Sequence, residues 1–190
     1  MKIHFIGIGG IGVSALAQYY LSKGAEVFGS DLVSSEITEL LEKKGAKVFI
    51  GKHKEQNIGQ DLDMVIYSPA VKEDNPEFTM AKKRNLNLLS YPQALGKLTK
   101  DYFTIAVSGS HGKSTTSAMI ANILIKAGFD PTVILGTKLA EFGDSNFRLG
   151  ASKYLIIEAD EYQVSFLNYW PEIILLTNLE EEHLDFFGNF

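Results

Sequence analysis

Residues 104–116, TIAVSGSHGKSTT, place a glycine-rich loop directly between an apolar strand and a helix-forming segment. The strand is predicted over residues 104–107 and the helix over residues 117–127. Backbone N–H groups of such a loop, together with the positive end of the helix dipole, bind phosphate oxygens. In this setting Lys113 is expected to reach the β- and γ-phosphates of a triphosphate, and Ser114 to ligate Mg²⁺. The segment therefore predicts a nucleotide site on an α/β scaffold.

The loop departs from the standard Walker A pattern. That pattern has a glycine at the position occupied here by Val107, and the loop G-x-x-G-K-S-T is shorter. A Gly-Lys-Ser tripeptide in an isolated turn is common, and by itself it would indicate little. Its place between a strand and a helix favours nucleotide binding.

The bulk composition limits the class of protein. The 190 residues are 45% hydrophobic and 22% charged, as in an ordinary globular protein of one large or two small domains. The net charge of −5 gives no argument for nucleic acid, and the absence of cysteine excludes disulfides and thiolate metal sites. The N-terminus lacks signal-peptide features and no apolar run is long enough to cross a bilayer, so a cytoplasmic protein without membrane insertion is expected.

A second glycine loop opens the chain. Residues 3–6 read as a buried parallel strand, followed by the sequence GIGGIG and an amphipathic helix over residues 13–23. Gly7, Gly9 and Gly12 fit the G-x-G-x-x-G pattern, in which glycines allow a tight turn and close approach to phosphate. The next strand, residues 25–29, leads to Asp31, at the position where a Rossmann fold binds a ribose hydroxyl. The pattern predicts a ligand with a phosphate and a ribose without identifying it.

The rest of the first half continues the alternation of helices and strands. The expected helices are residues 34–44, capped by Ser34 or Ser35, 75–84 and 91–98, and the expected strands are residues 47–50, 64–67 and 86–89. The loop Ser68-Pro69-Ala70-Val71 follows a strand end, where open α/β sheets bind ligands, although a simple turn is an equal alternative. His53 is interpreted as a surface-loop histidine, with contact to a ligand as the less favoured alternative. A domain boundary is placed near residues 97–102.

The second half of the chain has acidic residues directly after predicted strands. A strand over residues 132–135 is expected, then an irregular or hairpin segment over 136–150 with a turn at 143–146, and a strand over 154–157. The last strand leads to Glu158 and Glu161, of which Glu158 is the stronger candidate for Mg²⁺; a solvated acidic turn is the alternative. A strand over residues 173–177 precedes His183 in an acidic loop, which suggests a metal or phosphate role.

These features together resemble the Mur ligase family, the ATP-dependent amide ligases of peptidoglycan precursor synthesis and cell wall biogenesis. The resemblance rests on GIGGIG at 7–12, GSHGKSTT at 109–116, EADE at 158–161, and the segment from Thr177-Asn178 to His183-Leu184-Asp185. It implies a Rossmann-like parallel-sheet domain over residues 1–98 that binds UDP-N-acetylmuramate. It also implies that residues 99–190 are the first part of a P-loop-type α/β ATPase domain, with its remainder and the C-terminal domain absent.

The resemblance also implies roles for individual residues. The UDP-sugar would contact Gly7, Gly9, Gly10, Ile11, Gly12, Asp31, Ser68, Pro69 and Ala70. ATP would contact Gly109, Ser110, His111, Gly112, Lys113, Ser114 and Thr115. Lys113, Glu158 and His183 would be catalytic, and Ser114, Glu158 and His183 would bind Mg²⁺.

The implied reaction joins L-alanine to UDP-N-acetylmuramate through an acyl phosphate formed from ATP. Glu182 stands where the family usually has aspartate before the histidine, a small change. Because the chain lacks the third domain, we expect no ligase turnover from the 190 residues alone and an unpaired apolar sheet edge near residue 177. Three alternatives stay open: a recycling ligase that attaches a tripeptide, a NAD-dependent oxidoreductase, and a non-catalytic nucleotide-sugar binding module.

Overall fold

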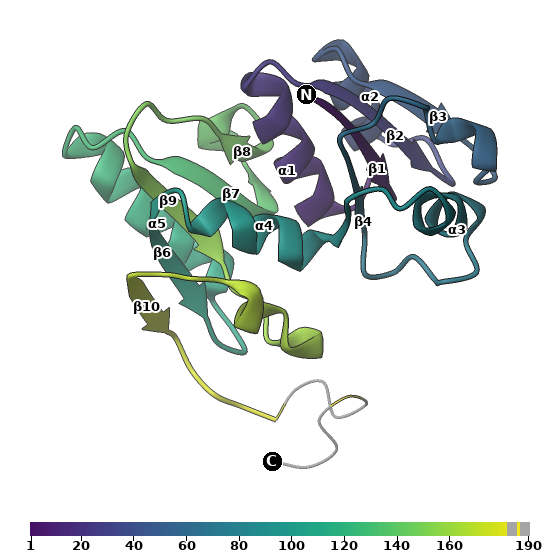
Figure 1. Ribbon diagram of the computed structural model, residues 1–190. Coiled ribbons are helices and arrows are strands. Elements are labelled where there is room, and N and C mark those ends of the chain that lie inside the picture. The colour runs from purple at the N-terminus through teal and green to yellow at the C-terminus, as the bar shows by residue number, and fades with distance from the viewer. Residues whose placement is uncertain (182–185, 187–190) are drawn as a thin grey trace. The chain divides into compact units, whose positions relative to one another are not determined.

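The chain forms two compact α/β units, Met1–Ala94 and Leu95–Phe190, in a computed structural model that describes residues 1–181 and 186 (Figure 1). The division falls within helix α4 (Tyr91–Thr99), a few residues before the boundary expected at residue 98. The α/β class predicted from the sequence is confirmed, with a five-stranded sheet in each unit. Among the described residues, no helix is long and apolar enough to cross a membrane.

The first unit is a parallel sheet with the strand order β3-β2-β1-β4-β5. Its elements are β1 (Lys2–Ile6), α1 (Ile11–Ser22), β2 (Glu26–Asp31), α2 (Glu36–Lys43), β3 (Lys47–Ile50), the 3-10 turn η1 (Glu55–Asn57), β4 (Met64–Tyr67), α3 (Pro76–Lys83) and β5 (Leu88–Ser90). The strand order changes direction between β1 and β4. Doubly wound sheets bind ligands at such a switch point, beyond the carboxyl ends of the strands.

The alternation of side chains along β1 places helices on both faces of this sheet. Phe5 lies 6.3 Å from Tyr20 of α1, measured between ring centroids. The next residue, Ile6, belongs to a buried cluster with Phe78 and Ala81 of α3. The helices α1 and α3 therefore cover opposite faces, and the strand ends between them stay open to a ligand.

The second unit is a mixed sheet with the order β10-β6-β9-β7-β8, in which only the β7–β8 pair is antiparallel among the described strand pairs. Its elements are β6 (Phe103–Ser108), α5 (Lys113–Lys126), β7 (Thr132–Leu139), η2 (Ala140–Phe142), β8 (Ser145–Arg148), β9 (Tyr154–Glu158), η3 (Tyr162–Asn168) and β10 (Ile173–Leu176). The core packs Ala121 of α5 against Ile105, Val133 and Ile156 of three adjacent strands. The helix α5, which follows β6 after the glycine–lysine loop, therefore covers one face of this sheet.

The structure corrects two predictions in this unit. The helix α5 begins at Lys113 rather than residue 117, because the N–H group of Thr116 already donates to the carbonyl oxygen of Gly112 (2.9 Å). The segment after residue 135 is the hairpin that was one of the two expected alternatives, but its first strand, β7, continues to Leu139, and Ser145 and Asn146 belong to β8 rather than to the predicted turn. At the sheet edge, the side chains of Ile174 and Leu176 on β10 are largely exposed.

Candidate functional site: two phosphate-binding loops

The first unit has a cleft of about 630 Å³ at the carboxyl ends of β1, β2 and β4. Three strand-end loops supply most of its wall: Gly7, Gly9 and Gly10 after β1, Asp31 and Leu32 at the end of β2, and Ser68, Ala70 and Val71 after β4. The cleft therefore occupies the switch point of the sheet, where a doubly wound fold binds a nucleotide.

The glycines of the first loop have either a positive φ or close neighbours. Gly7 has φ +78°, and its N–H group donates to the carbonyl oxygen of Ser30 (2.9 Å). A Cβ atom on Gly9 would lie 2.9 Å from Oδ2 of Asp31, and one on Gly12 would lie 2.7 Å from the Tyr91 ring. The loop thus keeps its backbone exposed to the cleft and leads directly into the N-terminus of α1.

Asp31 joins the first loop to the end of β2. Its Oδ2 atom accepts a 2.8 Å hydrogen bond from the N–H group of Gly9. This bond holds the carboxylate beside the glycine loop, on the wall of the cleft. A carboxylate at this point of the fold can accept a hydrogen bond from a ribose hydroxyl.

Six of the nine predicted UDP-sugar residues line the cleft, namely Gly7, Gly9, Gly10, Asp31, Ser68 and Ala70. Ile11 and Gly12 instead form the first turn of α1, and Pro69 lies in the turn after β4, outside the lining. Lys72 also lines the cleft and was not predicted from the sequence. Its position, shortly after a strand end, was the available signal for it.

His53 is not the surface-loop histidine expected from the sequence. Its side chain is 11% exposed, lines the cleft, and places Nδ1 3.1 Å from Oε1 of Glu77 and 3.1 Å from Oγ of Ser30. The fully buried Glu77 had no signal in the sequence, because its partners lie on other elements. The surface interpretation was wrong because tertiary packing brings the loop after β3 against α3.

The second unit carries the glycine–lysine loop between β6 and α5. Gly109 has φ +128°, and a Cβ atom there would collide with Thr177 and with the backbone of Asn178. Asn178 Oδ1 accepts from the N–H group of His111 (2.8 Å), and the Thr177 hydroxyl donates to the carbonyl oxygen of His111 (2.6 Å). The segment after β10 thus fixes the shape of the loop.

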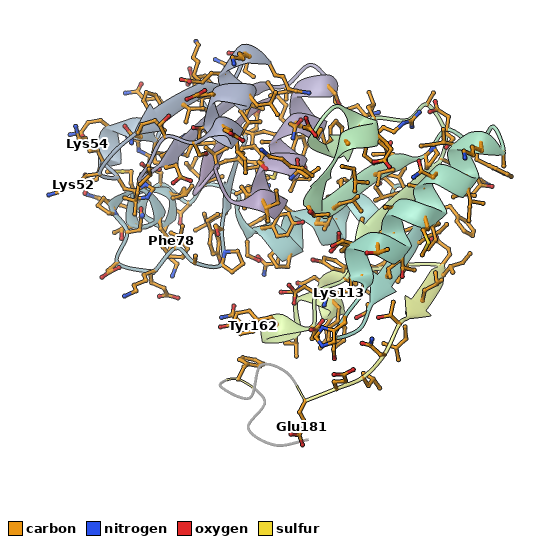
Figure 2. All side chains as sticks on the ribbon, turned by 180° about the vertical axis from the view of Figure 1, so that it is seen from behind. Lys52, Lys54, Phe78, Lys113, Tyr162 and Glu181 are labelled. Carbon is orange, nitrogen blue, oxygen red and sulfur yellow. The ribbon has the colours of Figure 1, made fainter. Side chains whose placement is uncertain are left out.

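Lys113 lies at the start of α5 with its ammonium group turned back over the loop. Its Nζ donates to the carbonyl oxygen of Gly109 (2.6 Å) and lies 3.2 Å from Oε2 of Glu161. Figure 2 shows Lys113 close to the segment that carries Tyr162, the residue that follows Glu161. The ammonium group therefore lies where it could contact a phosphate bound by the loop.

Ser114 and Glu158 meet at the ends of α5 and β9. The Ser114 hydroxyl donates to Oε2 of Glu158 (3.0 Å), and Oε1 of Glu158 accepts from the N–H group of Gly136 (2.9 Å). A hydroxyl and a carboxylate are oxygen ligands of the kind that Mg²⁺ prefers. Within residues 1–181 and 186, no three histidine or acidic side chains form a cluster suited to a metal, and His183 lies outside the described residues.

The fold defines an α/β protein with two glycine-rich loops, each placed between a strand and a helix as in proteins that bind nucleotides. Comparison with known proteins gives the family. Residues 2–103 match the Mur ligase family, catalytic domain, and residues 107–190 match the Mur ligase middle domain. The chain belongs to the Mur ligase family.

Individual relatives point the same way. The chain is 51% identical to the UDP-N-acetylmuramate–L-alanine ligase of Aquifex aeolicus, over all of this chain and 41% of the relative. The crystal structure of UDP-N-acetylmuramate–alanine ligase from Thermotoga maritima is 36% identical with a TM-score of 0.88, over all of this chain and 44% of that one. A ligase from Neisseria meningitides that is named for UDP-N-acetylmuramate and a tripeptide is 30% identical with a TM-score of 0.89, over 98% of this chain and 63% of that one. The chain thus spans about two fifths of the length of the curated relative.

Proposed function

We propose that this chain supplies the nucleotide-sugar site and the ATP-binding loop of an amide ligase that joins L-alanine to UDP-N-acetylmuramate. The observation that carries the proposal is the presence in one chain of two separate glycine-rich loops, each between a strand and a helix. The first has Asp31 beside it, and the second has Lys113 and the Ser114–Glu158 pair. A ligase that activates a nucleotide-linked carboxylate with ATP needs both sites.

In this proposal the cleft of the first unit binds UDP-N-acetylmuramate. The N–H groups of the glycine loop and the N-terminus of α1 are suited to the diphosphate. Asp31 would accept a hydrogen bond from a ribose hydroxyl, and Ser68 and Ala70 would line the path of the nucleotide-sugar. The approximate volume of 630 Å³ lies within the range of ordinary ligand pockets.

The second unit would bind ATP and stabilise the transfer of its γ-phosphoryl group. The substrate carboxylate attacks that phosphorus and releases ADP, which gives an acyl phosphate. The amine of alanine then attacks the acyl carbon, and a tetrahedral intermediate collapses to an amide and inorganic phosphate, with loss of a proton from the amine. Lys113 would exchange its contacts with Gly109 and Glu161 for contacts with phosphate oxygens. Its positive charge would then stabilise the negative charge of the phosphoryl group as that group moves from the leaving oxygen of ADP to the attacking oxygen of the carboxylate.

Ser114 and Glu158 are the residues proposed to hold Mg²⁺, and His183 is proposed to help hold a second ion. The hydroxyl oxygen of Ser114 and a carboxylate oxygen of Glu158 lie 3.0 Å apart, and both are the kind of oxygen ligand that a hard divalent cation prefers. When bound, the metal neutralises negative charge on the phosphates. The N–H group of Gly136 keeps the Glu158 carboxylate turned toward the serine.

The alternatives are less well supported. A dehydrogenase has no use for a glycine–lysine loop with a serine–glutamate pair behind it. The tripeptide-recycling ligase shares the fold, but the relative with 51% identity is named for L-alanine, against 30% for the tripeptide ligase. A purely binding module of the nucleotide-sugar would not need a second loop with the Lys113 ammonium group over it and the Ser114–Glu158 pair behind it.

The proposal can be tested with a chimera that joins residues 1–190 to the remaining part of the Aquifex aeolicus relative. We expect phosphate release that requires UDP-N-acetylmuramate, L-alanine and ATP together. The same chimera with Lys113→Met is the control. It should release no phosphate, because the activity is expected to depend on the glycine–lysine loop of this chain. A folded chimera without turnover, or one whose turnover survives Lys113→Met, contradicts the proposal.

A further inference from the structure

The segment that follows β10 forms hydrogen bonds with one half of the glycine–lysine loop. The N–H group of His111 donates to Oδ1 of Asn178 (2.8 Å), and the N–H group of Ser110 donates to the main-chain carbonyl oxygen of Asn178 (3.3 Å). The Thr177 hydroxyl donates to the carbonyl oxygen of His111 (2.6 Å), and the Thr177 N–H group donates to that of Ser108 (3.0 Å). Two consecutive residues after β10 therefore hold the backbone of the loop at three points.

Protein atoms also fill the space on this side of the loop. Oγ of Ser110 accepts a hydrogen bond from the N–H group of Glu180 (2.9 Å), and the Ser110 hydroxyl donates to the carbonyl oxygen of Glu180 (3.3 Å). A Cβ atom on Gly109 would collide with the Thr177 hydroxyl and would lie 2.8 Å from the carbonyl oxygen of Asn178. A phosphate group therefore has no room beside Gly109 on this side.

The other half of the loop is open. Gly112 has φ +82°, and an added Cβ atom there would have no heavy atom of the described residues within 4 Å, apart from its chain neighbours. The N–H group of Thr116 donates to the carbonyl oxygen of Gly112 (2.9 Å), which is the first hydrogen bond of helix α5. The N–H groups of Lys113, Ser114 and Thr115 come before it and have no acceptor within the helix. Such N–H groups at a helix N-terminus bind anions.

The two halves of the loop therefore differ in the N–H groups that they offer to a ligand. A backbone N–H group has one hydrogen, and a short hydrogen bond to an amide oxygen already uses it. For the N–H group of His111 to contact a phosphate, it would have to leave Asn178, whose oxygen would lose its donor. The N–H groups at the start of α5 reach a phosphate without breaking any helical hydrogen bond.

We propose that Asn178 is a positioning residue of the ATP site, assisted by Thr177. The two residues hold the N–H groups of Ser110 and His111 away from the nucleotide, so that the triphosphate is bound by the N–H groups of residues 112–115. The inference rests on the proposed function, because it divides the loop that is proposed to bind ATP. It narrows the contacts that the sequence implied, since the N–H group of His111 keeps its bond to Asn178 when ATP binds.

The first test is amide hydrogen exchange, followed residue by residue in nitrogen-15 spectra of the chain with and without Mg-ATP. An N–H group in a stable hydrogen bond exchanges slowly, and one that is exposed to water exchanges fast. We expect the N–H group of His111 to exchange slowly without nucleotide and to change little when Mg-ATP is added. Those of Ser114 and Thr115 should exchange fast without nucleotide and become slower by about tenfold or more with Mg-ATP.

The same spectra contain the results that overturn the proposal. If the N–H group of His111 exchanges fast in the ligand-free chain and becomes slow only with Mg-ATP, it is a phosphate donor and Asn178 does not hold it. Fast exchange at His111 in both states also contradicts the hydrogen bond to Asn178. The wild-type chain alone gives these results, so they do not depend on the folding of any variant.

Variants at position 178 separate the hydrogen bond from the space that the side chain fills. Asn178→Leu has a similar size but no acceptor, so His111 should lose its slow exchange and Mg-ATP binding should weaken about tenfold. Asn178→Asp keeps an acceptor oxygen and should keep the slow exchange at His111, whatever its added charge does to nucleotide affinity. Asn122→Leu, in the second half of α5, is the matched control and should change neither quantity. Slow exchange at His111 in folded Asn178→Leu would overturn the assignment.

Thr177 allows a second pair of variants, measured by calorimetric titration with Mg-ATP. Thr177→Val removes the hydroxyl group at nearly constant shape and should weaken binding about three- to tenfold, because the carbonyl oxygen of His111 loses its donor. Thr177→Ser keeps the hydroxyl group and should bind Mg-ATP as the wild type does. Equal losses in the two variants would show that the methyl group matters rather than the hydrogen bond, and would contradict the role of Thr177.

The inference and the proposed function fail differently. If the chain binds Mg-ATP and the N–H group of His111 is slowed only by the nucleotide, the inference about Asn178 is wrong and the proposed function stands. If His111 exchanges slowly in the ligand-free chain but neither this chain nor the chimera with the Aquifex aeolicus relative binds Mg-ATP, the proposed function of the loop is contradicted. The hydrogen bond between His111 and Asn178 then stands without a role in ATP binding.

Discussion

The Ser114 hydroxyl donates a 3.0 Å hydrogen bond to Oε2 of Glu158, which joins the first turn of α5 to the end of β9. The two residues are far apart in sequence and meet because β6 and β9 are neighbours in the sheet. A metal ion bound here would take the place of the hydroxyl hydrogen as the partner of the carboxylate. We therefore expect the affinity of this site for ATP to depend on Mg²⁺.

Glu158→Gln should remove most of the effect of Mg²⁺ on ATP binding. The amide keeps the side-chain shape but loses the charge that a divalent cation needs. The measurement is the calorimetric affinity of the chain for ATP with and without Mg²⁺. Glu141→Gln, an exposed acid in the same unit, is the matched control; an unchanged Mg²⁺ effect in Glu158→Gln would count against this metal site.

Lys113→Met should weaken Mg-ATP binding about ten- to hundredfold, since it removes a charge-assisted contact to phosphate. Lys126→Met, at the exposed far end of the same helix, removes an equal charge and should have little effect. Equal losses of Mg-ATP affinity in the two variants would show that Lys113 acts only through general electrostatic attraction to the nucleotide and makes no specific contact with a phosphate. Titration with Mg-ATP at two salt concentrations distinguishes these cases.

Gly29→Ala should lower the free energy of unfolding by about 1–3 kcal/mol through overpacking. The new Cβ atom would lie 2.8 Å from Cβ of Ile8, a fully buried residue of the first glycine loop. Denaturant unfolding measures the loss. At Gly59 the nearest heavy atom to an added Cβ is 3.7 Å away, so Gly59→Ala should cost little, and a similar loss in both variants would argue against the packing explanation.

Acid should destabilise the chain partly through Glu77. Its pKa is lowered from 4.5 to about 2, so its contribution to stability is fully present above about pH 4.5 and is lost as the pH falls toward 2. The contribution is at most about 3 kcal/mol. Glu77→Gln should therefore flatten the fall in unfolding free energy over this range, whereas the exposed Glu73→Gln should not. An equal slope in wild type and Glu77→Gln would contradict the buried-anion assignment.

The sequence predicted much of the fold because local signals were strong. The strands at 47–50 and 64–67 have the predicted bounds, since each is a short apolar run with polar or turn residues at its ends. Ser35 caps α2 as one of the two serines expected there, with the N–H group of Thr38 donating to its hydroxyl. The start of α5 was missed because Gly-Lys-Ser was read as loop, although the helical hydrogen bonds already begin there.

The sites could be predicted only in part, for a physical reason. Glycine loops and strand-end acids are contiguous in sequence, so Asp31 and Lys113 could be identified as candidates. The contact between His53 and Glu77 depends on tertiary packing across 24 residues of sequence. Nothing in the immediate sequence of either residue indicates that a buried carboxylate would face a loop histidine.

The most direct test of the central claim is calorimetric titration of the 190-residue chain with UDP-N-acetylmuramate and, separately, with NADH. The account predicts that the UDP-sugar binds and that NADH does not, and that Asp31→Asn weakens the UDP-sugar. Binding of NADH without binding of the UDP-sugar would contradict it and would make the first glycine loop a dehydrogenase site.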